Sequence, residues 1–594
     1  MKKSFLVDAA IGLLLTLFVA GSYLVGHPLL ESVELKTYDM RSKLRDDLNP
    51  SKEIVLIAID NNSIAALGRW PWPRSRLAAM VDKLAAAGPR LIGLDIVFSE
   101  AEQNQGIAEI ARLEERYNEL TAARSLIDKG GLFKAEFSSA AVRLDSDSKL
   151  AASIKQAGNV VLPMFFSEGG QLGAKPDEVP PSISSSSLSY QMSQSASAMS
   201  TPDGAKANFP ILQLAEGAAG IGHVSIEQDL DGTLRHELPV YRYGDYHYPS
   251  FAVQLVLAYA GVKSNEGVFT PGKSISVGKF TIPLDARNQM LITYNGPEQT
   301  FRTFSYQDVM NDKVSMDAFK DKIVIIGPTA SGVATVYVTP LTANFPPIET
   351  IATVVENILH SKYMVRPVWS EKAEWGLLGV VGLFIMFVLP RLRALAGLVV
   401  SLVLMTGLMG AGTHLFVQGQ WVKVAYPSIL LGLGYLVITS KRFLVTEKGK
   451  ELVEASAIET NKMLGLSFQG QGMLDIAFEK FRLCPLDDNM KDTLYNLGLD
   501  FERKRQFSKA AAVFDHIAAK DPKYKDIEAK TTMLKAASEG AVFGGVGGAK
   551  KDGTVMLSGG STKPTLGRYE IEKELGRGAM GIVYLGKDPK INRQ

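Results

Sequence analysis

Three glycines near the end of the chain have the spacing of a phosphate-binding loop. They are Gly576, Gly578 and Gly581, and Val583 completes the pattern G-x-G-x-x-G-x-V. Glycine suits such a loop because it has no Cβ, so the backbone can turn tightly and bring its N–H groups against phosphate oxygens. The same glycine spacing occurs in dinucleotide-binding folds, where it joins a strand to a helix. The chemistry indicated is nucleotide binding, and the flanking residues decide which kind.

The residues on both sides of this loop favour β-strands. They are Tyr569, Ile571 and Leu575 before it, and Ile582, Val583, Tyr584 and Leu585 around its end. We therefore expect a hairpin of two strands. The stretch 568–594 resembles the opening of bacterial eukaryotic-like (Hanks-type) Ser/Thr protein kinases, in which such a loop covers the ATP phosphates. The resemblance implies that the four loop residues bind ATP, with ATP and Mg²⁺ as cofactors of the full-length kinase.

The other kinase motifs are missing from the 594 residues. Phosphoryl transfer needs the V-A-I-K lysine, the base of the H-R-D loop and the D-F-G metal ligand. We therefore predict no catalytic residue, no cofactor and no ATP binding for this chain alone. Either the chain is a fragment of a longer kinase, or it is a non-catalytic membrane sensor or scaffold protein with a vestigial kinase start. We favour the fragment, because an isolated hairpin would expose apolar faces and unpaired edges.

Length and composition exclude some classes of protein. A chain of 594 residues indicates several domains. The 64 Lys and Arg nearly balance the 62 Asp and Glu, so no nucleic-acid partner is expected from charge. The single cysteine, Cys484, excludes an internal disulfide framework.

Four apolar segments predict transmembrane helices, so the lipid bilayer is an expected partner. Cleavage of the first as a signal peptide near Val19-Ala20-Gly21 is the alternative to an uncleaved anchor, which we favour. Basic residues mark the ends expected to face the cytoplasm: Lys2, Lys3, Arg391, Arg393, Lys441 and Arg442. The chain is thus expected to be a multi-pass protein of the bacterial inner or plasma membrane, with 27–371 outside and the C-terminus in the cytoplasm.

The outer segment contains a βαβ pattern. Ile54–Asp60 and Leu91–Phe98 are short apolar runs, and Arg76–Ala87 between them has helical periodicity. Two strands joined in this way should be parallel, with a right-handed crossover.

With further motifs downstream, this segment resembles the CHASE type 2 extracellular sensor domain. The motifs are Gly222-His223-Val224, Asp229-x-Asp231-Gly232-x-x-Arg235, I-V-I-I-G-P-T-A-x-G at 323–332, Thr339-Pro340-Leu341 and Pro347-Ile348-Glu349. The resemblance spans roughly 27–370. It implies a domain that binds an unknown extracytoplasmic ligand or responds to an unknown extracytoplasmic stimulus.

Three residues of the βαβ unit are candidates for binding that ligand. Asp60 ends one strand, Asp95 lies within the next, and Arg74 enters the helix. Ligands of open parallel sheets sit outside the carboxyl ends of the strands, where a polar effector could bridge these side chains. The alternative is a structural corner at the Trp-Pro-Trp-Pro run, with Asp60 paired to Arg74. We predict no metal site, and a hairpin turn rather than a calcium loop at Asp229–Gly232.

The segment after the spans contains a degenerate helical repeat. Leu497-Gly498-x-x-Phe501, Ala510 and Phe514 repeat Leu464-Gly465-x-x-Phe468, Ala477 and Phe481 at about 33 residues. This predicts paired helices of the tetratricopeptide (TPR) type, either as a spacer or as a groove for peptide partners. The Gly, Ser and Thr residues that follow predict a flexible linker.

The predicted fold class is a multi-domain membrane protein with an extracytoplasmic α/β sensor domain. The expected order is a cytoplasmic N-terminus (1–8), a transmembrane helix or signal anchor (9–26), the CHASE type 2 sensor domain (27–371), transmembrane helices (372–390, 394–413 and 422–440), a cytoplasmic juxtamembrane helix (441–459), an α-helical TPR-like spacer (460–538), a linker (539–567) and the β hairpin that starts a protein-kinase N-lobe (568–594). The resemblances imply a transmembrane receptor that phosphorylates protein substrates in its full-length form, within a homodimer.

Overall fold

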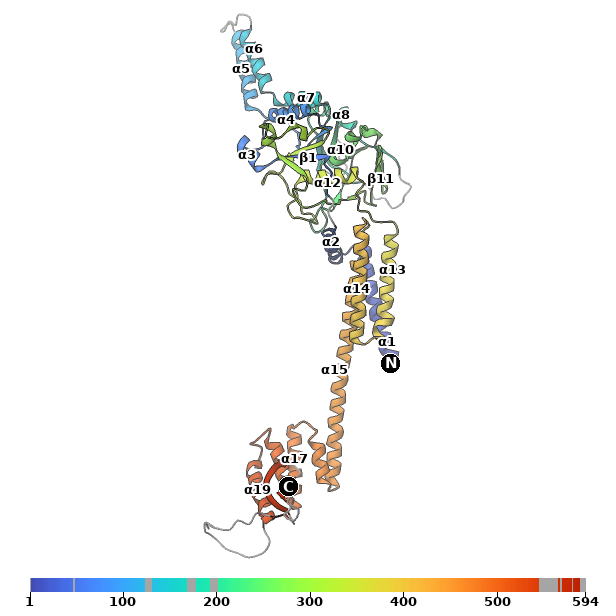
Figure 1. The fold of residues 1–594 in the computed structure, drawn as a ribbon, viewed down its shortest axis with the longest axis vertical. Coiled ribbons are helices and arrows are strands. Elements are labelled where there is room, and N and C mark those ends of the chain that lie inside the picture. Colours follow the sequence, from blue (N-terminus) through green and yellow to red (C-terminus); the bar gives the residue numbers. More distant parts are fainter. Residues whose placement is uncertain are drawn as a thin grey trace. The chain divides into compact units, whose positions relative to one another are not determined.

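The structure is a computed structural model that describes residues 2–45, 49–122, 131–167, 178–192, 201–543, 565–566, 569–578 and 581–587. The chain divides into two compact units, Met1–Thr439 and Ser440–Gln594. Figure 1 shows the elements of each unit along the chain.

A mostly parallel sheet is the centre of the first unit. Its strand order is β14 (Arg302–Ser305), β1 (Ile54–Ile59), β15 (Ile323–Pro328), β2 (Leu91–Leu94), β3 (Val160–Ser167) and β5 (Lys206–Asn208), with β6 (Gly220–His223) also pairing with β3. Only the pairing of β3 with β5 is antiparallel. Continuous apolar runs such as β1 are buried along their whole length, as expected for a parallel sheet covered on both faces.

The predicted parallel relation of β1 and β2 is confirmed, but the two strands are not neighbours. Ile323 of β15 pairs with Ile54 on one side and with Leu91 on the other. The first strand ends at Ile59 and the second at Leu94, so the prediction of a strand up to Phe98 was too long. Two helices, α3 (Asn61–Leu67) and α4 (Arg74–Ala87), lie between them in the chain, and only α4 was expected.

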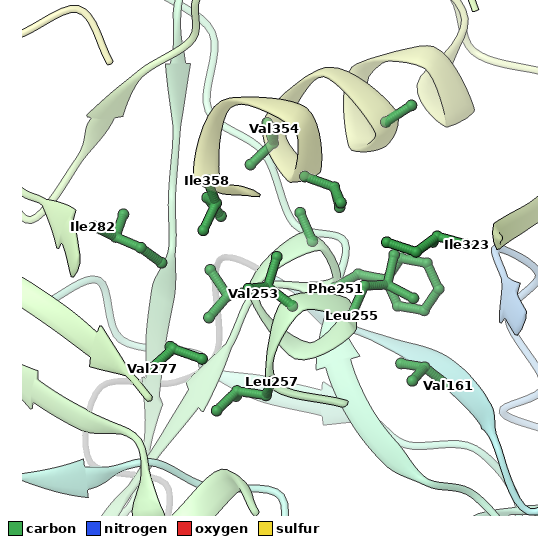
Figure 2. Packing of buried hydrophobic residues seen from close by; sticks show 14 of the residues in the cluster. Val161, Phe251, Val253, Leu255, Leu257, Val277, Ile282, Ile323, Val354 and Ile358 are labelled. Carbon is green, nitrogen blue, oxygen red and sulfur yellow. The ribbon is translucent and has the colours of Figure 1, made fainter. Parts of the chain in front are cut away.

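Side chains alternate between the two faces of this sheet, because successive residues of a strand point in opposite directions. Leu56 belongs to the cluster beneath α10 (Phe251–Ala260) and α12 (Pro347–Leu359), whereas Ile57 belongs to the cluster beneath α4 and α7 (Ser146–Ala157). Figure 2 shows the first cluster, in which side chains of α10 and α12 face each other.

The first unit also contains smaller elements. Its further helices are α5 (Gln105–Ala122), α6 (Leu132–Leu144), α8 (Pro181–Ser184), α9 (Leu212–Ala215) and α11 (Tyr306–Met310). A second sheet has the strand order β12 (Phe280–Pro283), β11 (Ser274–Val277), β10 (Val268–Thr270) and β4 (Ser189–Tyr190), and two strand pairs are β7 (His236–Glu237) with β13 (Met290–Leu291) and β8 (Val240–Tyr243) with β9 (Tyr246–Pro249).

Four helices within the described residues are long and apolar enough to cross a membrane: Phe5–Val25 of α1 (Lys2–Val25), Ser370–Arg391 beginning with α13 (Ser370–Leu383), Ala394–Val417 (α14) and Ala425–Val445 of α15 (Ala425–Gly470). They overlap the four predicted segments, 9–26, 372–390, 394–413 and 422–440, and their ends differ from the predicted ones by up to five residues. After Leu383 the helix of α13 widens into a π turn, Phe384–Val388, and ends in a 3₁₀ turn, Leu389–Arg391. Four such helices indicate a membrane protein.

The second unit contains the predicted paired helices. After α15 come α16 (Leu474–Phe481), α17 (Asp488–Arg503), α18 (Phe507–Ala518) and α19 (Ile527–Phe543). A Cβ on Gly465 would lie 2.4 Å from the Phe481 ring, and a Cβ on Gly498 would lie 2.6 Å from the Phe514 ring. The two glycine–phenylalanine contacts recur at the repeat spacing, so the small residues of the pattern do allow close helix packing.

Replacing Gly498 with alanine should weaken the second unit, although alanine is ordinarily the better helix former. The new methyl group would press on the buried Phe514 ring, and overpacking of this kind costs about 1–3 kcal/mol. We expect faster amide hydrogen exchange in α17 and α18, measured in the full chain by mass spectrometry. Gly449→Ala is the matched control, because nothing lies within 4 Å of its added Cβ. Equal exchange in both variants would contradict the prediction.

The chain ends in the predicted hairpin. Strand β17 (Tyr569–Gly578) pairs antiparallel with β18 (Gly581–Lys587), and β16 (Thr565–Leu566) pairs with β17. The linker was expected to begin at 539, but 539–543 belong to α19, and most of the remaining linker, 544–564, lies outside the described residues.

Candidate functional site

A cavity of about 390 Å³ lies at the carboxyl ends of the central strands. Asp95 follows β2, His223 ends β6 and Pro328 ends β15, and all three line it. The first turns of α10 and α12 close another side, with Ala252 and Thr350 among the lining residues. Open parallel sheets bind their ligands at this edge.

Two glycines allow the helices to begin directly against the strand ends. A Cβ on Gly222 of β6 would lie 2.7 Å from the Cα of Phe251, the first residue of α10. A Cβ on Gly327 of β15 would lie 2.2 Å from a methyl group of Ile348 in α12. Larger residues would push both helices away, so these glycines set the width of the cavity.

Two segments form the rim of the cavity. Trp70 and Pro71 come from the loop between α3 and α4, and Tyr337 comes from the segment after β15. The loop is anchored by Trp72, which is buried in the α4 cluster and donates from Nε1 to the Gly68 carbonyl at 2.8 Å. The Trp-Pro-Trp-Pro run thus packs as the expected corner through Trp72, while Trp70 faces the cavity.

Of the described residues that line the cavity, two are acidic and none is a lysine or an arginine. Burial raises the pKa of Asp95 to about 7. Burial also raises the pKa of Glu237 to about 7, against an opposing hydrogen bond with Ser250. Tyr337 is near both carboxyls, since burial and then the charges of Asp95 and Glu237 raise its pKa to about 12. Both carboxyls therefore change charge close to neutral pH.

His223 is the most unusual side chain of the lining. It is 1% exposed, and neither Nδ1 nor Nε2 has a hydrogen-bond partner among the described residues. Burial lowers the pKa of His223 to about 3, so the ring is neutral at physiological pH. The Ser225 backbone opposes this shift weakly, but its contact with the ring does not meet hydrogen-bond geometry. A neutral imidazole holds one donor and one acceptor, and leaving both unused in the interior is costly. A ligand in the cavity could satisfy them.

The structure brings only one of the three predicted ligand-binding residues to this cavity. Asp95 lines it. Asp60 caps α3 instead, accepting from Ser63 N at 2.8 Å and from Ser305 Oγ at 3.0 Å. The reason is that the chain turns into a short helix directly after β1, which the sequence pattern did not show.

Arg74 is held by a different acid from the one expected. Its guanidinium forms an ion pair with Asp147 of α7, donates to the Glu100 carbonyl and lies 5.1 Å from the centre of the Phe98 ring. The expected pair with Asp60 was therefore wrong, because α4 packs beside α7 and its first residue meets Asp147. Arg74 has a structural role in this arrangement.

His223 and Glu237 were not among the predicted site residues. The sequence contains the Gly222-His223-Val224 motif, but a histidine at the end of a strand is ordinarily structural. Glu237 lies on the two-residue strand β7, for which the sequence has no pattern. Among the described residues, no group of three or more His, Cys, Asp or Glu side chains could hold a metal ion.

The motif Asp229-x-Asp231-Gly232-x-x-Arg235 forms a turn that surrounds an arginine. The predicted turn is confirmed by the hydrogen bond from Gly232 N to Asp229 O at 2.8 Å. The Arg235 side chain is fully buried and donates to Asp229 at 2.7 Å, to Asp231 at 2.8 Å and to Asp39 at 2.7 and 2.8 Å. Hydrogen bonding from Arg235 lowers the pKa of Asp231.

Asp39 belongs to α2 (Pro28–Ser42), the helix that follows the first span. The same helix also contacts the segment between α14 and α15. Glu34 pairs with Arg41 at 2.5 Å, both side chains fully buried, and accepts from Trp421 Nε1 at 3.0 Å. Glu31 pairs with Lys423 at 2.5 Å. Helix α2 thus connects the buried Arg235 with the ends of the apolar helices.

The four predicted nucleotide-binding residues lie on the C-terminal hairpin. Gly576 pairs with Val583, and Gly578 pairs with Gly581. The two residues at the tip of the loop, 579–580, lie outside the described residues. The backbone therefore places these residues together at one end of the hairpin.

One comparison with known proteins identifies part of this chain. The family model described as the CHASE2 domain matches residues 11–388, which is more than half of the chain and includes α2 and every residue of the cavity. No curated protein and no solved structure matches the chain.

Proposed function

Because this chain belongs to the CHASE2 domain family, and CHASE2 is a sensor domain, we propose that it is a membrane sensor whose ligand occupies the cavity beside Asp95 and His223. The observation that carries the proposal is the fully buried His223, with both ring nitrogens unpartnered at the wall of an acidic cavity. A sensor needs such a site to gain binding energy from a small molecule.

Helix α2 would transmit the effect of ligand binding in the cavity to the membrane-spanning helices. Glu237 of the cavity lies two residues after Arg235, whose guanidinium binds Asp39 of α2. A shift of β7 on ligand binding would move Arg235 and, through Asp39, the end of the first span. A ligand that favours one position of this connection would shift the population of the two states.

The orientation supports an extracytoplasmic stimulus. The basic residues Lys2, Lys3, Arg391, Arg393, Lys441 and Arg442 favour a cytoplasmic side for the N-terminus and for everything after Lys441. The sensor domain would then lie outside a bacterial inner or plasma membrane.

The output proposed for the full-length form is Ser/Thr phosphorylation of protein substrates, with ATP and Mg²⁺ as cofactors. The glycine pattern and the antiparallel hairpin of β17 and β18 support this. The helices between α15 and α19 would act as a TPR-like spacer or peptide-binding surface, within a homodimer. The alternative is a non-catalytic sensor or scaffold that recruits cytoplasmic partners through these helices.

The proposal is tested on the native protein, isolated from its source cells with an antibody against residues 460–524 and placed in lipid nanodiscs. Phosphate transfer from labelled ATP is measured for the wild type and for Ala334→Trp. Ala334 lines the cavity from the rim, so an indole there occupies the space of the ligand. We expect phosphorylation to change about fivefold relative to the wild type, within the usual range of coupling between sites.

Ser331→Trp is the matched control, since Ser331 is exposed and is not part of the cavity lining. The same change in both variants, or a change in neither, would contradict the role of the cavity. Absence of phosphate transfer in the wild type would contradict the kinase output and favour the non-catalytic sensor or scaffold.

A further inference from the structure

We propose that the cavity binds an organic cation, a protonated primary amine with an apolar body, whose charge is balanced by Asp95 and Glu237. This inference rests on the proposed sensor function and names the class of its ligand. It follows from three properties of the lining: its charge, its unpartnered hydrogen-bonding groups and its aromatic surface.

The charge of the lining has one sign. Asp95 and Glu237 contribute carboxyls, and none of the lining residues is a lysine or an arginine. No hydrogen bond or ion pair joins the Asp95 carboxyl to another of the described residues, and burial alone raises its pKa. Charged side chains in a protein interior are ordinarily paired, so two acids in one cavity favour a cation from outside the chain.

The hydrogen-bonding capacity of the lining matches an ammonium group. An ammonium has three N–H donors, whereas carboxylates and the bare nitrogen of a neutral imidazole are acceptors. His223 offers such a nitrogen, which has no hydrogen-bond partner in the described part of the chain. An ammonium ligand would donate to carboxylate oxygens and could also donate to the bare nitrogen of the imidazole.

Aromatic and aliphatic residues provide the rest of the surface. Trp70, Tyr337 and Phe251 line the cavity together with Val224 and Ile351. The faces of aromatic rings attract cations, and tryptophan does so most strongly. A volume of about 390 Å³ falls within the range of small-molecule sites, so there is room for an apolar body besides the charged group.

The alternative is an anionic ligand, which the first turns of α10 and α12 could favour through their helix dipoles. Those turns have few free donors, however. Ser250 Oγ already accepts from Val253 N in α10, and Pro347 of α12 has no N–H. A metal ion is disfavoured as well, because the described His, Cys, Asp and Glu side chains form no group suited to one.

Binding of a cation should depend on pH with a defined sign. The pKa values of Asp95 and Glu237 are both raised to about 7 by burial, so lowering the pH protonates them. Their protonation removes the counter-charge of the ligand, while a primary amine stays protonated across this range. Affinity should therefore fall on acidification, by up to about tenfold per pH unit for each carboxyl.

The experiment is isothermal titration calorimetry on the full chain in lipid nanodiscs. The probes are butylammonium and 2-phenylethylammonium, each compared with the alcohol and the carboxylate of matching carbon skeleton. We expect at least one amine to bind about tenfold or more tightly than its alcohol and its carboxylate. The double variant Asp95→Asn/Glu237→Gln should lose this preference. Asp245→Asn, an exposed acid outside the cavity, should keep it.

The outcomes separate this inference from the proposed function. If an alcohol or a carboxylate binds as well as the amine and Ala334→Trp abolishes its binding, the cation class is wrong and the sensor site stands. If no probe binds, the cation class is overturned, and the phosphorylation response of Ala334→Trp then decides the sensor function independently. Unchanged amine affinity between about pH 8 and pH 5 would also overturn the inference.

Discussion

Replacing Arg235 with methionine is expected to destabilise the unit of residues 1–439 by about 3–5 kcal/mol, the usual cost of removing one partner from a buried ion pair. The arginine side chain is fully buried and holds three carboxylates, those of Asp39, Asp229 and Asp231. Without it these acids repel one another, and methionine supplies no donor. The midpoint of thermal unfolding in nanodiscs should fall by roughly 5–10 °C.

Arg242→Met is the matched control for this prediction. Arg242 forms an ion pair with Asp203 in which both side chains are about half exposed, and such pairs contribute about 0–1 kcal/mol. Arg235→Lys should fall between the two, because a lysine cannot reach all three acids with fixed geometry. An equal loss in Arg235→Met and Arg242→Met would contradict a stabilising role for the buried arginine.

The second large effect is a pH dependence of stability that originates in the cavity. The pKa values of Asp95 and Glu237 in the folded protein are about 7, above the usual values near 4 of an unfolded chain. Between about pH 4 and pH 7 the folded state therefore binds more protons than the unfolded state. The free energy of unfolding contributed by these carboxyls falls as the pH rises through this window.

His223 contributes a pH dependence of the free energy of unfolding with the opposite sign. Its folded pKa of about 3 lies below the usual value of 6.5, so its contribution to the free energy of unfolding rises with pH between these values. The double variant Asp95→Asn/Glu237→Gln removes the two carboxyl contributions and leaves that of His223.

We expect the free energy of unfolding of this double variant to match that of the wild type near pH 4 and to exceed it by about 2–4 kcal/mol above pH 7. The difference is smaller than the full pKa shifts would give, because both residues are only partly buried and keep some solvent contact. The measurement is the thermal midpoint of the full chain in nanodiscs across this range. Asp245→Asn should follow the wild type. Parallel curves for the double variant and the wild type would show that the carboxyls titrate normally.

Much of the architecture was predictable because it depends on local patterns. Apolar runs such as Ile54–Ile59 and the four long apolar segments have lengths and compositions that only buried strands or membrane spans explain. The glycine–phenylalanine repeat likewise predicted paired helices, since Gly498 and Phe514 lie at positions that must touch. The turn at Asp229–Gly232 followed from its own four residues.

The site was less predictable because it is assembled from distant parts of the chain. Asp95 follows β2, His223 ends β6 and Glu237 ends β7. Tyr337 comes from the segment after β15. The pairing of Arg74 with Asp147 depends on the packing of α4 beside α7, which no local pattern specifies. Asp60 was predicted to bind the ligand, whereas it caps the short helix α3. The sequence alone does not distinguish a helix-capping aspartate from an unpaired aspartate at the end of a strand.

The position of β15 has a consequence for the biosynthesis of this protein. Strand β15, which pairs with both β1 and β2, is residues 323–328. The ribosome makes it more than two hundred residues after β2, so β1 and β2 cannot pair with it before then. At usual rates of translation this interval is on the order of 10–50 s. During that time the nascent chain carries two apolar strands with open edges, beside the membrane that holds its first span. Open strand edges of this kind attract other chains, so we expect the unfinished sheet to be prone to aggregation until β15 has been made.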